Sequence, residues 1–138
     1  MVRNSSAPAL EEYWRLYRAG KYFDAHEVLE DAWRAESGSE RERLQGLIHA
    51  AVARHHHQNG NAEGAARQCV RAHVRLGDFA SDAVFLGELA SAVASSIAAL
   101  DAAGRARLKE LEDRLRQERR DKSVQIQSVA TLGRALED

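Results

Sequence analysis

The chain has 138 residues, with 20 Lys and Arg against 21 Asp and Glu, so its formal net charge is −1. A chain of this length suits one domain built around a single core. The balance of charge excludes a general electrostatic attraction to nucleic acid or to an anionic membrane. We therefore expect neither of these partners.

Compartment is indicated by the cysteine content and by the absence of long apolar runs. The one cysteine, Cys69, excludes a disulfide within the chain. The first six residues are not followed by the apolar run of a signal peptide. The longest weakly polar stretch, residues 90–100, is too short to cross a bilayer of about 30 Å. We expect a cytoplasmic protein.

Helix is the only secondary structure that the sequence predicts. Proline occurs once, at position 8, Ala, Leu, Arg and Glu recur throughout, and no segment alternates in the manner of a strand. We predict an all-α protein, a compact helical bundle of four to five helices. The bundle core would occupy residues 1–100, and residues 101–138 would form a charged and amphipathic helical extension.

The first predicted helix begins after Ser5 or Ser6, which can act as the N-cap, and ends at Gly20. Pro8 suits its first turn, where a missing N–H costs no hydrogen bond. Its inward face is expected to carry Leu10, Trp14 and Tyr17.

Three further helices are expected at residues 22–36, from Ser39 to Asn59, and at residues 62–76. Ser39 and Glu42 have the spacing of a capping box, in which each side chain bonds a free backbone N–H of the first turn. Candidates for the core on the second helix are Phe23, Val28 or Leu29, and Trp33.

Apolar residues between Leu86 and Leu115 follow spacings of three and four that make an eleven-residue repeat. Such a repeat fits a nearly straight helix, but Asp101 and Gly104 are suited to a helix break. We predict two helices that meet near Asp101.

The last part of the chain changes character. Residues 105–122 intersperse bases with acids, which is typical of a solvated helix face. After them, apolar residues return at helical intervals, so residues 105–138 either bind a second copy or another protein, or end in a frayed tail. Both interpretations stay open. The apolar positions are Ile126, Val129, Leu132 and Leu136.

A candidate site lies on the second and third helices. His26 and Glu30 are four residues apart and so share a helix face, with Glu27 beside them. Short connections make the two helices antiparallel neighbours, so a polar stripe on the third helix could face this pair. The residues of the third helix concerned are Gln45, His49 and His56, with His55 on the adjoining stripe.

Two interpretations of these polar residues stay open. Neutral imidazole and ionised carboxylate are suitable ligands for a divalent metal, which could activate a water for hydrolysis. Alternatively, a His–Glu pair between helices satisfies buried polar groups without metal or chemistry. His55, His56 and His57 point about 100° apart on a helix and cannot all serve one site. Trp33 is a candidate for the wall of a pocket, although its size favours packing in the core.

No catalytic residue is assigned. The residue four beyond His26 is Glu30 and not a second histidine, so the zinc-protease signature is missing. No histidine has Glu three positions before it, which removes the di-iron bundle signature. Whether the protein is an enzyme, and whether it uses a cofactor other than a possible divalent metal, stays undecided.

The order of three motifs resembles a bacterial and archaeal family catalogued as domain of unknown function 309. The motifs are the turn and His-Glu-x-x-Glu helix at residues 20–33, Leu-Gln-Gly-Leu-Ile at residues 44–48, and the histidines before Gly60-Asn61. The resemblance covers roughly residues 10–100. It implies a compact helical bundle with these helices packed together, and it brings no established reaction. It matches His26, Glu27, Glu30, Trp33 and Gln45 to the family pattern, and either His55 or His56 to its histidine; the family pattern implies an uncharged residue at His49.

Two functions follow as hypotheses. The first is a metal or small-ligand site between the second and third helices. The second is a non-catalytic assembly module, in which the polar cluster fixes the helix register and residues 105–138 form the interface.

Overall fold

The computed structural model describes residues 6–137, with side chains up to residue 123. Within that part of the chain every regular element is a helix, which confirms the all-α class. The described chain forms seven α-helices and one short 3₁₀ helix, more than the four to five predicted with an extension. The difference arises after residue 82, where the chain breaks at Val93 and again before Ala102. The elements are α1 (Ala7–Arg18), α2 (Tyr22–Ala35), α3 (Gly38–Gln58), α4 (Ala62–Leu76), η1 (Ala80–Asp82), α5 (Ala83–Ala92), α6 (Ala94–Ala98) and α7 (Ala102–Glu137).

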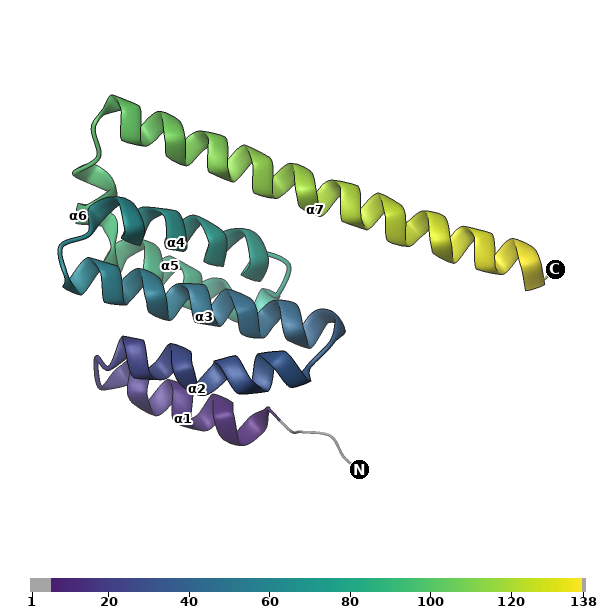
Figure 1. Cartoon of the computed structure of the whole chain (residues 1–138), viewed down its shortest axis with the longest axis horizontal. Coiled ribbons are helices and arrows are strands. Elements are labelled where there is room, and N and C mark those ends of the chain that lie inside the picture. Colours follow the sequence, from purple (N-terminus) through teal and green to yellow (C-terminus); the bar gives the residue numbers. More distant parts are fainter. Residues whose placement is uncertain (1–5, 138) are drawn as a thin grey trace.

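The first four helices form two tight hairpins with α3 in the centre. Helix α3 packs against α2 on one side and α4 on the other (Figure 1). Gly20 and Gly60 close the two hairpins with φ angles of 79° and 75°, a conformation that glycine adopts without strain. Helix α3 also approaches α4 closely at Gly46, where an added Cβ would lie 2.5 Å from Cγ of Leu76.

The start of α3 differs from the prediction. The helix begins at Gly38, with Ser37 as its N-cap and no side-chain capping bond. Ser39 therefore lies inside the first turn, where its hydroxyl cannot cap the helix. The Glu42 carboxylate instead accepts hydrogen bonds from arginines of other helices, so the predicted capping box is not formed.

The main core lies where α1, α2 and α3 meet the end of α4. Tyr13 is fully buried and donates its hydroxyl to the carbonyl of Leu47, 2.7 Å away. The predicted core residue Phe23 is 49% exposed, so that prediction was wrong, whereas Leu29, the alternative to Val28, is fully buried. Trp33 is half-buried against the core.

Helix α7 begins where the break near Asp101 was predicted, which confirms that boundary. The Asp101 carboxylate accepts from the backbone N–H of Gly104 at 2.7 Å and so caps the helix. Helix α7 packs along α4, buries Leu111, and then continues past the bundle (Figure 1). The backbone of residues 124–137 is helical, but the side chains of the apolar positions 126–136 lie outside the described set.

The charged stretch of α7 is more than a solvated face. Arg107 bonds Glu63 of α4 at 2.7 Å, and Arg119 bonds Glu42 of α3 at 2.9 Å. These ion pairs connect α7 to its own bundle at residues 107 and 119. None of the helices described is both long enough and apolar enough to cross a membrane.

Candidate functional site

The predicted pair on α2 is present, and its partners are local. Nε2 of His26 lies 3.6 Å from the carboxylate of Glu30, and Nδ1 of His26 donates to the backbone carbonyl of Phe23. Glu30 also lies 3.7 Å from Arg34, one turn further along α2. Glu27 is exposed on the adjoining face. The pair is therefore held by its own helix.

His55 of α3 contacts the same aromatic ring as His26 of α2. The ring of Phe23 contacts His26 at a centroid distance of 4.6 Å and His55 at 5.1 Å. The two imidazoles thus share one aromatic neighbour, which accounts for the exposed position of Phe23.

His49 faces a different helix from the one expected. Its Nδ1 donates to the side-chain oxygen of Gln68 on α4, 2.6 Å away. Burial lowers the pKa of His49 to about 4, although the bond to Gln68 opposes this, and the nearby Arg75 and Arg71 lower it further. His49 is a neutral, structural contact between α3 and α4.

The three consecutive histidines diverge, as the geometry of a helix requires. His55 lies on the α2 side, His56 lies near the Asn61 side chain, and His57 is hydrogen-bonded with the buried Ser96 hydroxyl of α6 at 2.7 Å. Among the residues described, no three His, Cys, Asp or Glu side chains converge as metal ligands would. The structure does not bring His26, Glu30, Gln45 and His56 into one site.

A groove of about 800 Å³ lies where the turn between α2 and α3 faces α7. This volume is within the range of small-molecule sites. Trp33 and Gln45, both candidates from the sequence, line the groove. The guanidinium of Arg41 stacks over the Trp33 ring, 4.2 Å from its centroid. The other lining residues are Ser37, Gly38, Ser39, Glu42, Asp78, Arg119, Lys122 and Ser123.

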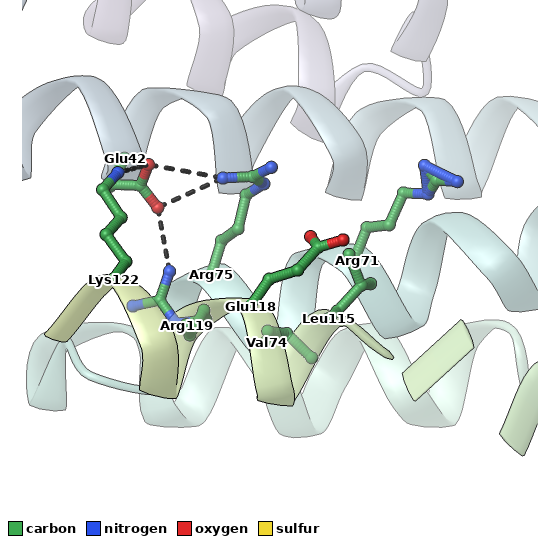
Figure 2. A pocket seen from close by; sticks show the side chains of 8 residues that line it. All are labelled: Glu42, Arg71, Val74, Arg75, Leu115, Glu118, Arg119 and Lys122. Atoms are coloured by element: carbon green, nitrogen blue, oxygen red, sulfur yellow. Dashed lines mark hydrogen bonds and ion pairs between the residues drawn. The ribbon is translucent and has the colours of Figure 1, made fainter. Parts of the chain in front are cut away.

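The Glu42 carboxylate connects α3 to cations of α4 and α7 at the groove. Its carboxylate accepts from Arg75 at 3.1 Å and from Arg119 at 2.9 Å, and Nζ of Lys122 lies 3.6 Å away (Figure 2). Burial alone would raise the pKa of Glu42, but the three cations outweigh it and lower that pKa below its usual range. One carboxylate thus serves three cations from α4 and α7.

A smaller hollow of about 170 Å³ adjoins the groove between α4 and α7 and shares Glu42, Arg119 and Lys122 with it (Figure 2). Arg71 lines the hollow, and its guanidinium lies apart from the Glu42 network (Figure 2). Burial lowers the pKa of Arg71, and the neighbouring Arg67, Arg114 and Arg75 lower it further. The remaining lining residues are Val74, Arg75, Leu115 and Glu118.

Two buried donors at these hollows have no acceptor among the described residues. They are Nε1 of the Trp33 indole and Nε of the Arg71 guanidinium. A buried N–H without an acceptor costs about 1–3 kcal/mol, and most buried donors in folded proteins are paired. The groove and the hollow beside it are thus lined by cations and by two residues that each carry a buried donor without an acceptor.

Sequence reasoning identified Trp33 and Gln45 but missed the cations around them. A signal was present on α4, where Arg67, Arg71 and Arg75 recur every fourth residue and so share one face. The cations of α7 could not be assigned to this site, because nothing local indicates that α7 folds back along α4.

Comparison with known proteins finds a family match in the first half of the chain. The family model described as domain of unknown function 309 matches residues 10–68. The protein "Uncharacterized protein YpuF" of Bacillus subtilis (strain 168) is 43% identical over 47 residues, which are 33% of this chain and 27% of that protein. The chain thus spans about a quarter of the length of this relative. No solved structure matches. The matched segment begins in α1 and ends within α4, so the resemblance to the domain of unknown function 309 family is confirmed over residues 10–68.

Proposed function

We propose that this protein binds a small organic anion in the groove between the α2–α3 turn and α7. The observation that carries the proposal is the Trp33–Arg41 stack, whose indole N–H is buried without an acceptor at the wall of an 800 Å³ groove. An anionic group supplies the missing acceptor, and an aromatic or apolar body packs on the indole.

The charge of the lining supports an anion. Three cations line the groove, Arg41, Arg119 and Lys122, against the carboxylates of Glu42 and Asp78. Both carboxylates are already bonded to Arg119. Arg41 has no ion pair among the described residues, so its guanidinium is available to a ligand.

The proposed function is the binding of a small organic anion, without a reaction. Gln45 and the serines at 37, 39 and 123 add neutral hydrogen-bonding groups to the lining. The two carboxylates of the lining are both bonded to Arg119, and no reaction is proposed for the groove.

The test uses isothermal titration of the full chain with benzoate and with phenyl phosphate, which share an aromatic body and differ in the anionic group. We expect at least one probe to bind with a Kd below about 1 mM. Trp33→Phe removes the indole donor and should weaken that binding about tenfold, because a hydrogen bond to a charged group contributes about 1.5–3 kcal/mol. Trp14→Phe is the matched control, since Trp14 packs against Tyr13 and Phe85 away from the groove, and should change the Kd less than twofold. Equal weakening in both variants, or no binding up to about 10 mM of either probe, would contradict the proposal.

A second function, assembly of two copies through α7, is supported by the length of that helix. Helix α7 has 36 residues and continues past the bundle, and apolar residues recur at helical spacing in its last part (Figure 1). An apolar stripe of this kind on a projecting helix favours pairing with a second α7. Light scattering of the full chain and of Leu132→Asp tests it: we expect a dimer that the variant dissociates, and a monomeric full chain would contradict the idea.

A further inference from the structure

The residues that line the hollow between α4 and α7 have a larger excess of positive charge than those that line the groove beside it. Four cations line it, Arg71, Arg75, Arg119 and Lys122, against two carboxylates, Glu42 and Glu118. The excess of two positive charges is gathered in about 170 Å³, a volume of several water molecules at about 30 Å³ each. A phosphate monoester carries about −1.5 to −2 at neutral pH, which matches this excess.

The two carboxylates are not equally free to offset the cations. Glu42 is shared among Arg75, Arg119 and Lys122, so its one charge is spread over three partners. Glu118 lies 3.9 Å from Arg114, outside the hollow, and its side chain is 63% exposed. Neither carboxylate lies within ion-pair distance of Arg71 in the part of the chain that the structure describes.

Arg71 is therefore the unmatched group of the hollow. Arg71 is partly buried, its Nε is buried without an acceptor, and the charges that act on it are three arginines, Arg67, Arg75 and Arg114, and one carboxylate, Glu118. Positive charge thus outnumbers negative charge around Arg71, and an added anion would reduce the repulsion between these cations. Phosphate oxygens match the fork of guanidinium donors, whereas a single carboxylate uses fewer of them.

We propose that the hollow between α4 and α7 binds the phosphate group of a phosphomonoester, with Arg71 and Arg75 as its main donors, and that the body of the ligand lies in the groove, where a second acceptor group of the ligand bonds the Trp33 indole N–H. This inference rests on the proposed function, and it names the ligand class of that same site. The two hollows share Arg119 and Lys122, so one ligand can reach both.

The experiment titrates the full chain with inorganic phosphate, phenyl phosphate and benzoate. We expect phenyl phosphate to bind at least tenfold more tightly than benzoate, and inorganic phosphate to bind and to compete with phenyl phosphate. Arg71→Gln should weaken phenyl phosphate about tenfold or more, since one charge-assisted hydrogen bond is lost, and should leave benzoate unchanged.

Arg116→Gln is the matched control, because it removes the same charge from an exposed side chain of α7 that neither lines the hollow nor acts on Arg71. We expect it to change each affinity less than twofold. Equal weakening by Arg71→Gln and Arg116→Gln would show that phosphate responds only to general charge, and would overturn the inference. Benzoate binding that depends on Trp33, together with no preference for phosphate, would overturn the inference and leave the proposed function standing. If none of the three probes binds, both the proposed function and this inference are wrong.

Discussion

The polar groups inside the bundle and those beside α7 differ in how fully they are paired. Inside the bundle, His49 bonds Gln68, His57 bonds Ser96, and the buried Asp82 receives two bonds from Arg43 at 2.9 Å each. Beside α7, Trp33 and Arg71 keep buried donors without acceptors. The comparison teaches that residue type alone does not mark a binding site. His49, a predicted ligand, is paired within the fold, whereas the unpaired donors belong to Trp33, a predicted pocket wall, and to Arg71, which sequence reasoning did not single out.

The largest expected loss of stability comes from removing one partner of the most buried ion pair, Arg43–Asp82. Asp82→Ala leaves the Arg43 guanidinium without the carboxylate that raises its pKa, and should lower the free energy of unfolding by about 3 kcal/mol. Urea unfolding measures this loss. In a double-mutant cycle with Arg43→Ala, the coupling between the two sites should be large. A loss below about 1 kcal/mol would show that the pair contributes little to the fold.

A pH-dependent effect should follow from His49. The pKa of His49 is about 4 in the folded protein against 6.5 for a free histidine, so the unfolded chain takes up a proton between these values while the folded chain does not. Stability from this group is complete above pH 6.5 and is lost as the pH falls toward 4, by up to about 3 kcal/mol. His49→Gln, which cannot titrate, should remove this part of the pH dependence. Urea unfolding of both proteins from pH 7.5 to 4 tests it, and identical slopes would contradict the assignment.

A smaller effect is expected at His26 and Glu30. Their contact is local to α2 and Glu30 is 42% exposed, so His26→Ala should cost less than about 1 kcal/mol. Thermal unfolding with and without Zn²⁺, Mn²⁺ or Ni²⁺ should give the same difference between wild type and variant. A stoichiometric metal that is lost in His26→Ala would break the comparison, because it would make this pair a ligand site after all.

The smallest effect is expected at the unpaired cation. Arg71→Gln removes a charge that burial and the neighbouring arginines disfavour, so the free energy of unfolding should stay within about 0.5 kcal/mol of wild type or rise. Urea unfolding in a buffer without phosphate or sulfate measures it. A marked loss of stability would mean that Arg71 supports the fold and is not held for a ligand.

The sequence predicted the hairpins of α1–α4 because their signals are local. Gly20 and Gly60 close turns, and the periodic apolar residues of each helix lie within a few turns of one another. The core was predicted less well: Leu29 is buried as one of its candidates, but the Phe23 ring lies against two histidines and the neighbouring Tyr22 is buried in its place. The spacing of apolar residues identifies a helix face only to within about one residue, and that is enough to exchange Phe23 and Tyr22.

The site depended on contacts that no local pattern contains. Trp33 and Gln45 were identified because they stand in the motifs of α2 and α3, but Arg119 is 77 residues from its partner Glu42. Its role follows only when α7 is known to fold back along α4. The same limit explains why Ser39 and Glu42 were taken for a capping box: Glu42 has the spacing for one, and distant arginines compete for its carboxylate.

The central claim is that the buried indole N–H of Trp33 is held for an anionic ligand, and nitrogen–proton NMR of the two indole groups tests it most directly. Trp14→Phe and Trp33→Phe assign the two signals. We predict that phenyl phosphate or benzoate shifts the Trp33 indole signal in a saturable way, with the downfield change of a new hydrogen bond, while the Trp14 signal stays in place. If neither signal moves at saturating probe, or if both move together, the groove beside Trp33 is not a ligand site.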